Sequence, residues 1–529
     1  MRKSIIIFLI LSNSIMFGQE ISKTEKYQSD FNYLTAKLIE THPDPFLGFG
    51  GSIEFYKKKI RLNELITDSM TNEEFVILLN QFLSNLDDGH TSIYFPKKEN
   101  VAKKYLPLKF KISADKMFVQ NSTKEFIRLK GNQLIEINKI PISELLIKAK
   151  SFEPSENISG EYYSLNKIIS KSQLCQKFFG TTKLEFTFSS NEGNLFSLDI
   201  PFQQQVEFTP DNSNIEFKND NGLLYWSLIG ENKNVGYLAW NSILSREVLE
   251  NTFKNSPDWI QGNLNWAYTY LKEKQSGDIE QDILKTPSLY EQFYQLSKAM
   301  KKSNSKYLII DLRNNSGGMT PIVRPLLYIL SGDDYLNFDF EAEMIRKISP
   351  LYLQKIGFSD IADFNKTYDC NYKIGDYTFG SFGNVNPNLT LEEKREMLKR
   401  GYYGFGAEYI QKSEPLTDVQ IFVLTSPQTF SAAYHFTYFL KKLGRTKLIG
   451  VAPRQAGNAF METTNFTLPN TGISGSISNS KQILFKDDPE LGRLLKPDYE
   501  MNWDDFKYYG FDKNAEILKT LELIEYENN

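Results

Sequence analysis

The stretch YLIIDLRNNSGG, residues 307–318, carries the clearest structural pattern in the chain. Its first half is a continuous apolar run, which is typical of a strand buried on both faces of a sheet. Its second half ends on Gly317 and Gly318, which let the backbone turn tightly and direct N–H groups at one point, as an oxyanion hole requires. Taken alone, the loop fits an ordinary glycine turn better, and a phosphate-binding loop is disfavoured because no Gly-Lys-Ser/Thr follows.

Similar elements surround this strand and predict an α/β core. Further strands are expected at residues 235–240, 419–424 and 447–451, and helices at residues 321–330 and 431–443. This alternation predicts a sheet covered by helices. The core is placed at residues 220–515, with insertions near residues 248–300 and 332–415 that are expected to be helical in part and able to cover the site.

Two different regions precede the core. Residues 19–98 have helical apolar spacing and are interpreted as an N-terminal helical domain. Residues 99–210 alternate apolar and polar side chains and are interpreted as β-rich. The glycine turn, strand and second turn at residues 131–142 resemble part of a PDZ domain, which binds peptide C-termini at a sheet edge. A plain β-rich spacer fits that segment as well.

The segment TSPQTFSAA, residues 425–433, places Ser431 at the junction of a buried strand, a turn and a helix. This placement exposes a hydroxyl at a helix N-terminus, where N–H groups and the helix dipole favour an oxyanion. Serine is also a common N-cap, and on this segment alone that reading is the stronger one.

The segment LDDGHT, residues 86–91, places His90 in a turn between a helix and a strand. An imidazole in such a turn can act as a general base. Before other evidence is weighed, a lone loop histidine is more often a surface residue.

Taken together and in this order, the segments at residues 88–91, 311–318 and 430–433 resemble the tail-specific, or C-terminal-processing, serine peptidases. That group includes the tricorn core and the repeats of interphotoreceptor retinoid-binding protein. The resemblance covers about residues 30–510 and is supported by the motifs at residues 444–450 and 496–498. It implies a crotonase/ClpP-like ββα protease core, a peptide or protein substrate and no cofactor, and it leaves homo-oligomerisation open.

The resemblance also implies roles for individual residues. Ser431 is the expected nucleophile, His90 its base, and Glu490 the acid that orients His90, with Asp487 or Asp488 as alternatives. The expected oxyanion hole consists of Gly317, Gly318 and Ala432. Ser-Lys chemistry is disfavoured, because residues 453–458 (PRQAGN) lack the expected lysine and Lys447 stands on a strand before the turn.

Composition narrows the class of protein. With 61 basic and 65 acidic side chains the net charge is −4, so no basic field favours nucleic acid. Residues 1–18 combine an Arg-Lys start, an apolar run and a small residue, which predicts a signal peptide and a periplasmic or extracellular protein that is not inserted in the membrane after cleavage. Three histidines and two distant cysteines form no metal-binding spacing.

Two rival functions stay open at this stage. The retinoid-binding repeats indicate that a relative can serve as a binding module without catalysis. Alternatively, the PDZ-like part could make the chain a peptide-binding scaffold, although no carboxylate-binding loop is evident there.

Overall fold

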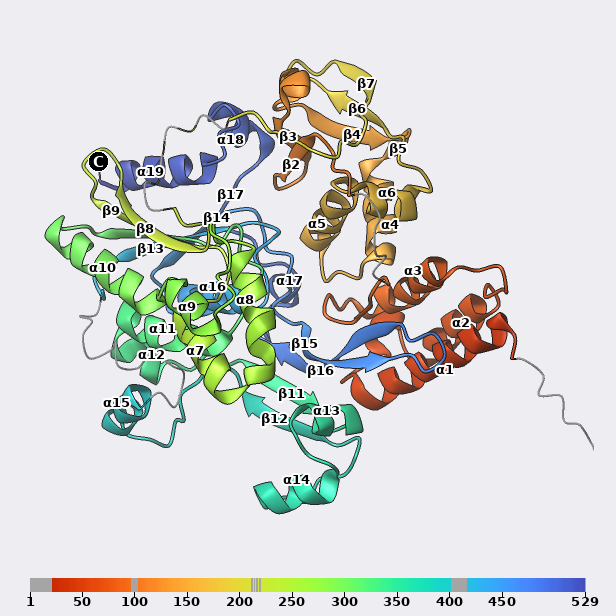
Figure 1. Cartoon of the computed structure of the whole chain (residues 1–529). Helices are drawn as coiled ribbons and strands as arrows, with labels where there is room; N and C mark the ends of the chain where they lie inside the picture. The colour runs from red at the N-terminus through yellow and green to blue at the C-terminus, as the bar shows by residue number, and fades with distance from the viewer. Residues whose placement is uncertain are drawn as a thin grey trace, which may run out of the picture.

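We analysed a computed structural model of the chain, which describes residues 21–96, 103–210, 213, 215, 217, 220–400 and 416–528 (Figure 1). The signal peptide predicted at residues 1–18 lies outside the described residues. Within the described part of the chain, no helix combines the length and apolar character that crossing a bilayer requires. Cys175 and Cys370 are not bonded to each other.

The N-terminal region is helical, as its apolar spacing predicts. Its helices are α1 (Lys23–Thr41), α2 (Ser52–Asn63) and α3 (Asn72–Leu83), followed by the short strand β1 (Ser92–Ile93). Thr71 and Glu74 form a capping box that fixes the start of α3, because each side chain accepts a hydrogen bond from the other's backbone N–H.

The second region carries an antiparallel sheet in the order β2-β3-β4-β6-β7, with β5 paired to β4. Its strands are β2 (Leu108–Ile112), β3 (Met117–Ser122), β4 (Gln133–Ile137), β5 (Ile140–Pro141), β6 (Glu185–Ser189) and β7 (Leu195–Asp199). The reading of this region as simply β-rich was incomplete. Three helices stand between β5 and β6, namely α4 (Ile142–Phe152), α5 (Ile158–Ile169) and α6 (Ser172–Phe179).

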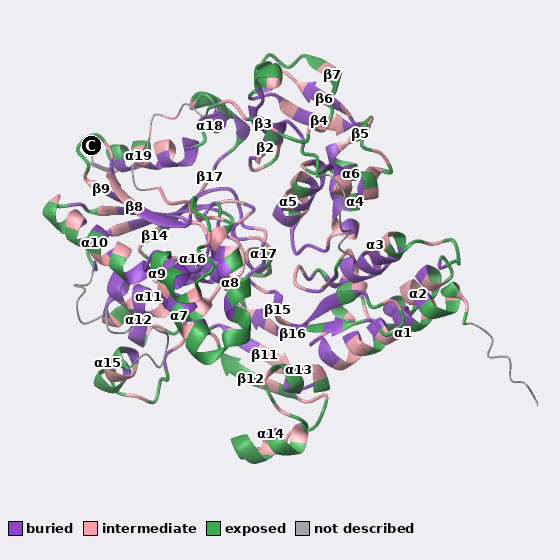
Figure 2. Ribbon diagram, in the orientation of Figure 1, coloured by how far each residue is buried: buried purple, intermediate pink, exposed green. Residues whose placement is uncertain are grey.

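The core sheet has the order β17-β14-β13-β10-β9-β8 and is parallel from β17 to β9. Its strands are β8 (Leu224–Ile229), β9 (Val235–Trp240), β10 (Tyr307–Asp311), β13 (Gln420–Thr425), β14 (Thr446–Gly450) and β17 (Tyr499–Glu500). In β10, Leu308 to Asp311 are all buried, so the strand carries apolar side chains on both faces. Figure 2 shows the buried residues concentrated in this sheet and in the helices beside it.

Helices cover the core sheet, as the β-α alternation predicts. They are α7 (Arg246–Asn255), α8 (Ile260–Tyr268), α9 (Ile279–Lys285), α10 (Leu289–Lys302), α11 (Val323–Ser331), α16 (Ala432–Lys442), α17 (Pro489–Arg493), α18 (Trp503–Tyr508) and α19 (Ala515–Asn528). The first four occupy the segment interpreted as an insertion near residues 248–300, and α10 packs on β8 and β9.

The second interpreted insertion, near residues 332–415, contains strands as well as helices. Its described elements are α12 (Asp333–Asn337), β11 (Glu343–Lys347), α13 (Pro350–Lys355), α14 (Ile361–Tyr368), β12 (Tyr377–Ser381) and α15 (Leu391–Lys399). β11 and β12 join a second sheet of order β1-β16-β11-β12.

A long hairpin connects the core to the N-terminal helices. Its strands, β15 (Phe460–Thr467) and β16 (Ser474–Ile483), leave the core beyond β14 and run toward α1 (Figure 1). β16 pairs with β1 in the register Ser92 with Ser476, and Phe466 and Ile477 join the apolar core of the N-terminal helices. This pairing brings the turn that carries His90 back to the core sheet.

Candidate active site

Ser431 lies at the sharp turn between β13 and α16. Its backbone has φ +53° and ψ −125°, a conformation that L-residues rarely adopt and that costs about 1–3 kcal/mol. The side chain makes no N-cap hydrogen bond, so helix capping does not account for this serine. The Ser431 N–H donates to Gln455 Oε1, and this contact pins the strained backbone. Backbone strain held in place at a half-buried serine is typical of a nucleophile elbow.

The glycine loop predicted from the sequence packs directly against this turn. A Cβ on Gly317 would lie 2.7 Å from Ser431 Cβ, so only glycine allows the approach. The prediction of Gly317 as an oxyanion donor is wrong, because the Gly317 N–H already donates to Asn315 Oδ1 over 2.8 Å. No described residue accepts from the N–H groups of Gly318 and Ala432, which leaves these two as the available donors.

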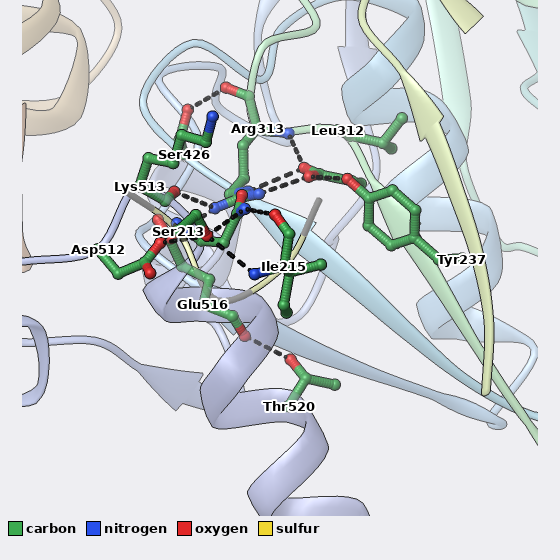
Figure 3. Close-up of polar contacts among 12 residues, drawn as sticks. Ser213, Ile215, Tyr237, Leu312, Arg313, Ser426, Asp512, Lys513, Glu516 and Thr520 are labelled. Atoms are coloured by element: carbon green, nitrogen blue, oxygen red, sulfur yellow. Dashed lines mark hydrogen bonds and ion pairs between the residues drawn. The ribbon is translucent and has the colours of Figure 1, made fainter. Parts of the chain in front are cut away.

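A buried charge network fixes the base of the same loop (Figure 3). Arg313 donates from Nε to Asp311 Oδ1 over 2.9 Å and from Nη1 to Glu516 Oε2 over 2.5 Å. Ser426 Oγ donates to the Arg313 carbonyl over 2.5 Å, which links the loop to the turn before Ser431. Lys111 Nζ lies 2.6 Å from Glu516 Oε1, so β2 is tied to the network as well. Because Arg313 is surrounded by acceptors, it is a structural anchor rather than a free cation.

His90 comes to this site from the N-terminal region. Its N–H donates to Asp88 Oδ1 over 2.8 Å, and its carbonyl accepts from Ser476 Oγ over 2.8 Å. The imidazole stacks on Phe430, the residue before Ser431, with ring centroids 4.7 Å apart. His90 therefore lies beside the turn that carries Ser431.

The carboxylate at His90 belongs to Glu156. Glu156 Oε1 lies 3.1 Å from His90 Nδ1, and Oε2 accepts the Ala456 N–H over 2.7 Å. Glu156 is only 4% exposed, so neither contact is shared with bulk solvent. A buried carboxylate held by a backbone N–H is suited to orienting an imidazole.

The acid predicted from the family resemblance, Glu490, does not reach His90. Its side chain is exposed on the short helix α17. The alternatives Asp487 and Asp488 are exposed too, and Asp488 caps α17 by accepting the Leu491 N–H. The sequence reasoning missed Glu156 because it searched for the acid C-terminal to Ser431, whereas this carboxylate precedes α5 in the second region.

Burial and charge act on the pKa of His90 in opposite directions. Burial lowers the pKa of His90, whereas the hydrogen bond and the charge of Glu156 raise it. The rise is larger than the fall, so the pKa of His90 lies above its ordinary value. Burial raises the pKa of Glu156, and the hydrogen bonds from His90 and Ala456 oppose that rise. Each group thus favours the ionised form of the other.

The other two histidines have structural surroundings. His42 Nε2 lies 3.3 Å from Asp88 Oδ2, and both side chains are fully buried. His435 lies between Thr320 Oγ1 and Gln482 Oε1, and burial lowers its pKa to about 4. Neither one contacts Ser431 through its ring in the described structure.

One group of potential metal ligands is found among the described residues. Atoms of Asp88, His90 and Glu156 lie within 4.8 Å of one another. These atoms are the ones that hold the His90 ring and turn, so the group coincides with the histidine site and is not a separate centre.

Comparisons with known proteins bear on the family and the fold. Residues 278–481 match the model of peptidase family S41, a segment that contains the glycine loop and Ser431 but not His90 or Glu156. Among solved structures, mature CPAF complexed with lactacystin is 16% identical, with a TM-score of 0.56 over 96% of this chain and 99% of that chain. Mature CPAF alone is 15% identical, with a TM-score of 0.54 over 94% and 98% of the two chains. No curated protein sequence matches the chain. The two structures share the fold with this chain.

Proposed function

We propose that the chain is a serine peptidase of the S41 type, with Ser431 as its nucleophile, His90 as its general base and Glu156 as the carboxylate that orients His90. The observation that carries the proposal is the contact of Glu156 with His90 Nδ1 over 3.1 Å, beside the strained turn at Ser431. We further propose that the substrates are exported peptides or proteins.

The hydrogen bond to Glu156 determines which nitrogen of His90 reacts. Because Glu156 is an acceptor, Nδ1 carries the proton, and the lone pair of Nε2 is free to accept the proton of Ser431. Ser431 Oγ then forms a bond to the carbonyl carbon of the peptide. The Gly318 and Ala432 N–H groups would donate to the resulting oxyanion.

Collapse of the tetrahedral intermediate breaks the C–N bond, and His90 returns the proton to the leaving nitrogen. A water molecule, deprotonated by His90, then hydrolyses the acyl ester on Ser431. Glu156 stabilises the imidazolium in both halves of the reaction, so its charge acts where positive charge develops.

The surrounding architecture suggests how substrate reaches the site. We propose that residues 220–515 form a ClpP-like core and that residues 99–210 are a PDZ-like domain that adds a peptide strand to its sheet edge. The composition of residues 1–18 supports export to the periplasm or the extracellular space. Self-association is an additional expectation from the family resemblance.

Hydrolysis of a broad peptide library by the mature chain tests the function. We expect the wild type to cleave peptides. In both Ser431→Ala and His90→Ala, kcat should fall by about 10⁴-fold or more, because one change removes the nucleophile and the other removes the base that activates it. Near-ultraviolet circular dichroism would check folding. Retained activity in folded Ser431→Ala would contradict the nucleophile. Binding of peptides without cleavage by the wild type would favour a binding module.

A further inference from the structure

A small cavity of about 150 Å³ lies beside the proposed catalytic residues. We call it the Arg454 cavity, and its wall includes Gly89, Ser155, Gly160, Tyr163, Phe430 and Arg454. Phe430 precedes Ser431 and Gly89 precedes His90, so the cavity adjoins both. Its size suits a carboxylate group or a few water molecules.

Arg454 is held in this wall by aromatic rings rather than by an acid. Its guanidinium lies 3.9 Å from the Tyr163 ring centroid and 4.4 Å from that of Phe430. No ion pair joins it to any carboxylate among the described residues, and its buried Nη1 has no acceptor there. An unmet buried donor on a charged group is costly, so this nitrogen needs a partner.

A second unmet donor stands in the same wall. Ser155 is 5% exposed, and within the described structure its Oγ has no hydrogen-bond partner. The N–H of Gly160, in the first turn of α5, already donates to the N-cap Asn157. The two unmet donors, Arg454 Nη1 and Ser155 Oγ, therefore favour an anion in the cavity.

The acidic side chains of the wall already have partners. Glu153 pairs with Lys167 over 2.6 Å, and Glu156 is held by His90 and the Ala456 N–H. Among the charged side chains of the wall, Arg454 is the one that no described carboxylate contacts, so its guanidinium can take an incoming anion.

We propose that the Arg454 cavity binds a carboxylate of the peptide substrate, which is either its free C-terminus or an Asp or Glu side chain near the scissile bond. The site rests on the proposed function, because it is defined by its place beside Ser431 and His90. Arg454 Nη1 and Ser155 Oγ donate to the carboxylate, and the rings of Tyr163 and Phe430 hold the guanidinium in a fixed orientation.

The test uses one cleaved peptide made in matched forms. One pair differs only in a C-terminal carboxylate or amide, and a second pair only in Asp or Asn near the cleaved bond. The ratio of kcat/KM for the acidic over the neutral member is measured in the wild type, Arg454→Gln, Arg454→Lys and Ser155→Ala. Lys57→Gln serves as the control, because it removes a paired, exposed cation on α2 that is not part of the cavity wall.

We expect a wild-type ratio of about tenfold or more in one of the two pairs, and that pair identifies the source of the carboxylate. The ratio should fall toward one in Arg454→Gln, fall less in Ser155→Ala and Arg454→Lys, and persist in Lys57→Gln. A wild-type ratio of one in both pairs, or an unchanged ratio in Arg454→Gln, overturns the proposal.

Fluorescence polarisation measures binding of the same peptides to Ser431→Ala. This measurement separates the proposed carboxylate site from the proposed catalytic mechanism. If the wild type cleaves no peptide but binding still shows a carboxylate preference that depends on Arg454, the binding site is supported and the peptidase mechanism is contradicted. Equal binding of acidic and neutral peptides would overturn the site whether or not the wild type is active.

Discussion

Two histidine–carboxylate pairs meet at one turn, and they differ in what surrounds them. His42 and Asp88 lie 3.3 Å apart with both side chains fully buried, and His42 Nδ1 accepts the Asp44 N–H. His90 and Glu156 lie 3.1 Å apart, but the His90 side chain is 15% exposed and stacks beside the turn of Ser431. The first pair has no route to a substrate, whereas the second leaves one ring nitrogen available.

Both pairs join a histidine to a carboxylate, so the residue types alone do not determine whether a pair supports the fold or takes part in the reaction. Asp88 is common to both, because its Oδ2 faces His42 while its Oδ1 accepts the His90 N–H. We interpret the buried pair as the support that holds the His90 turn, and the more open pair as the reacting unit. The predictions that follow separate these two roles.

The largest difference is expected between two glutamates. In Glu156→Gln, the amide can still accept a hydrogen bond but cannot stabilise an imidazolium, so kcat should fall about 10³–10⁴-fold. Glu490→Gln is the matched control, and because its side chain is exposed its kcat should stay within about twofold of the wild type. Steady-state hydrolysis of one peptide measures both. A loss confined to Glu490→Gln would restore the acid suggested by the family resemblance.

Removing the buried pair should affect stability more than chemistry. Asp88→Asn leaves His42 without its carboxylate, and we expect a loss of about 1–3 kcal/mol in the free energy of unfolding. The fall in kcat should stay below about tenfold, because the asparagine oxygen can still accept the His90 N–H. Urea unfolding and peptide hydrolysis of the same preparation provide both numbers.

The pH dependence of stability sharpens this prediction. Burial raises the pKa of Asp88, but His42, His90 and Thr91 lower it more, to about 2, from an ordinary value of 3.8. A lowered carboxyl pKa stabilises the fold above about pH 4, and the contribution of about 2 kcal/mol is lost as the pH falls toward 2. In Asp88→Asn, this part of the decrease in the free energy of unfolding at low pH should be absent. An identical acid profile in the variant would contradict the role given to Asp88.

The smallest expected effect is a shift in the pH profile of kcat/KM. His90 must be neutral to act as a base, and Glu156 raises its pKa, so the acid limb should lie above that of an unperturbed histidine. In Glu156→Gln the limb should move to lower pH. His435 does not contribute at neutral pH, because burial lowers its pKa to about 4. An unmoved limb would indicate that another group titrates.

Much of this arrangement could be predicted from local sequence. The apolar run of β10, the two glycines and the placement of Ser431 after β13 are local features, and each lies where expected. The turn that carries His90 is also a local feature, but its approach to Ser431 depends on the pairing of β1 with β16, which local patterns do not reveal.

Glu156 could not be predicted in the same way. It lies 66 residues from His90 in the sequence, and its two contacts, to His90 and to the Ala456 N–H, both join distant segments. The region was also read as β-rich, so a carboxylate before a helix had no place in it. The helical apolar spacing of α4 and α5 was a signal that could have been read.

The loop after β14 illustrates a further limit. Residues 453–458 drew attention only because they lack a lysine, yet Gln455 holds the Ser431 backbone and Ala456 holds Glu156. Arg454, between these two functions, stacks on Phe430. Backbone contacts and ring stacking of this kind depend on the folded loop and leave no periodic pattern in the sequence.

Covalent labelling with a serine-directed fluorophosphonate tests directly whether His90 and Glu156 activate Ser431, and peptide mass spectrometry locates the labelled residue. We expect modification of Ser431 in the wild type and in Glu490→Gln at similar rates, and labelling slowed by about 10³-fold or more in His90→Ala and Glu156→Gln. Labelling of a different serine, or equal labelling of Ser431 in all four proteins, would contradict activation of Ser431 by His90 and Glu156.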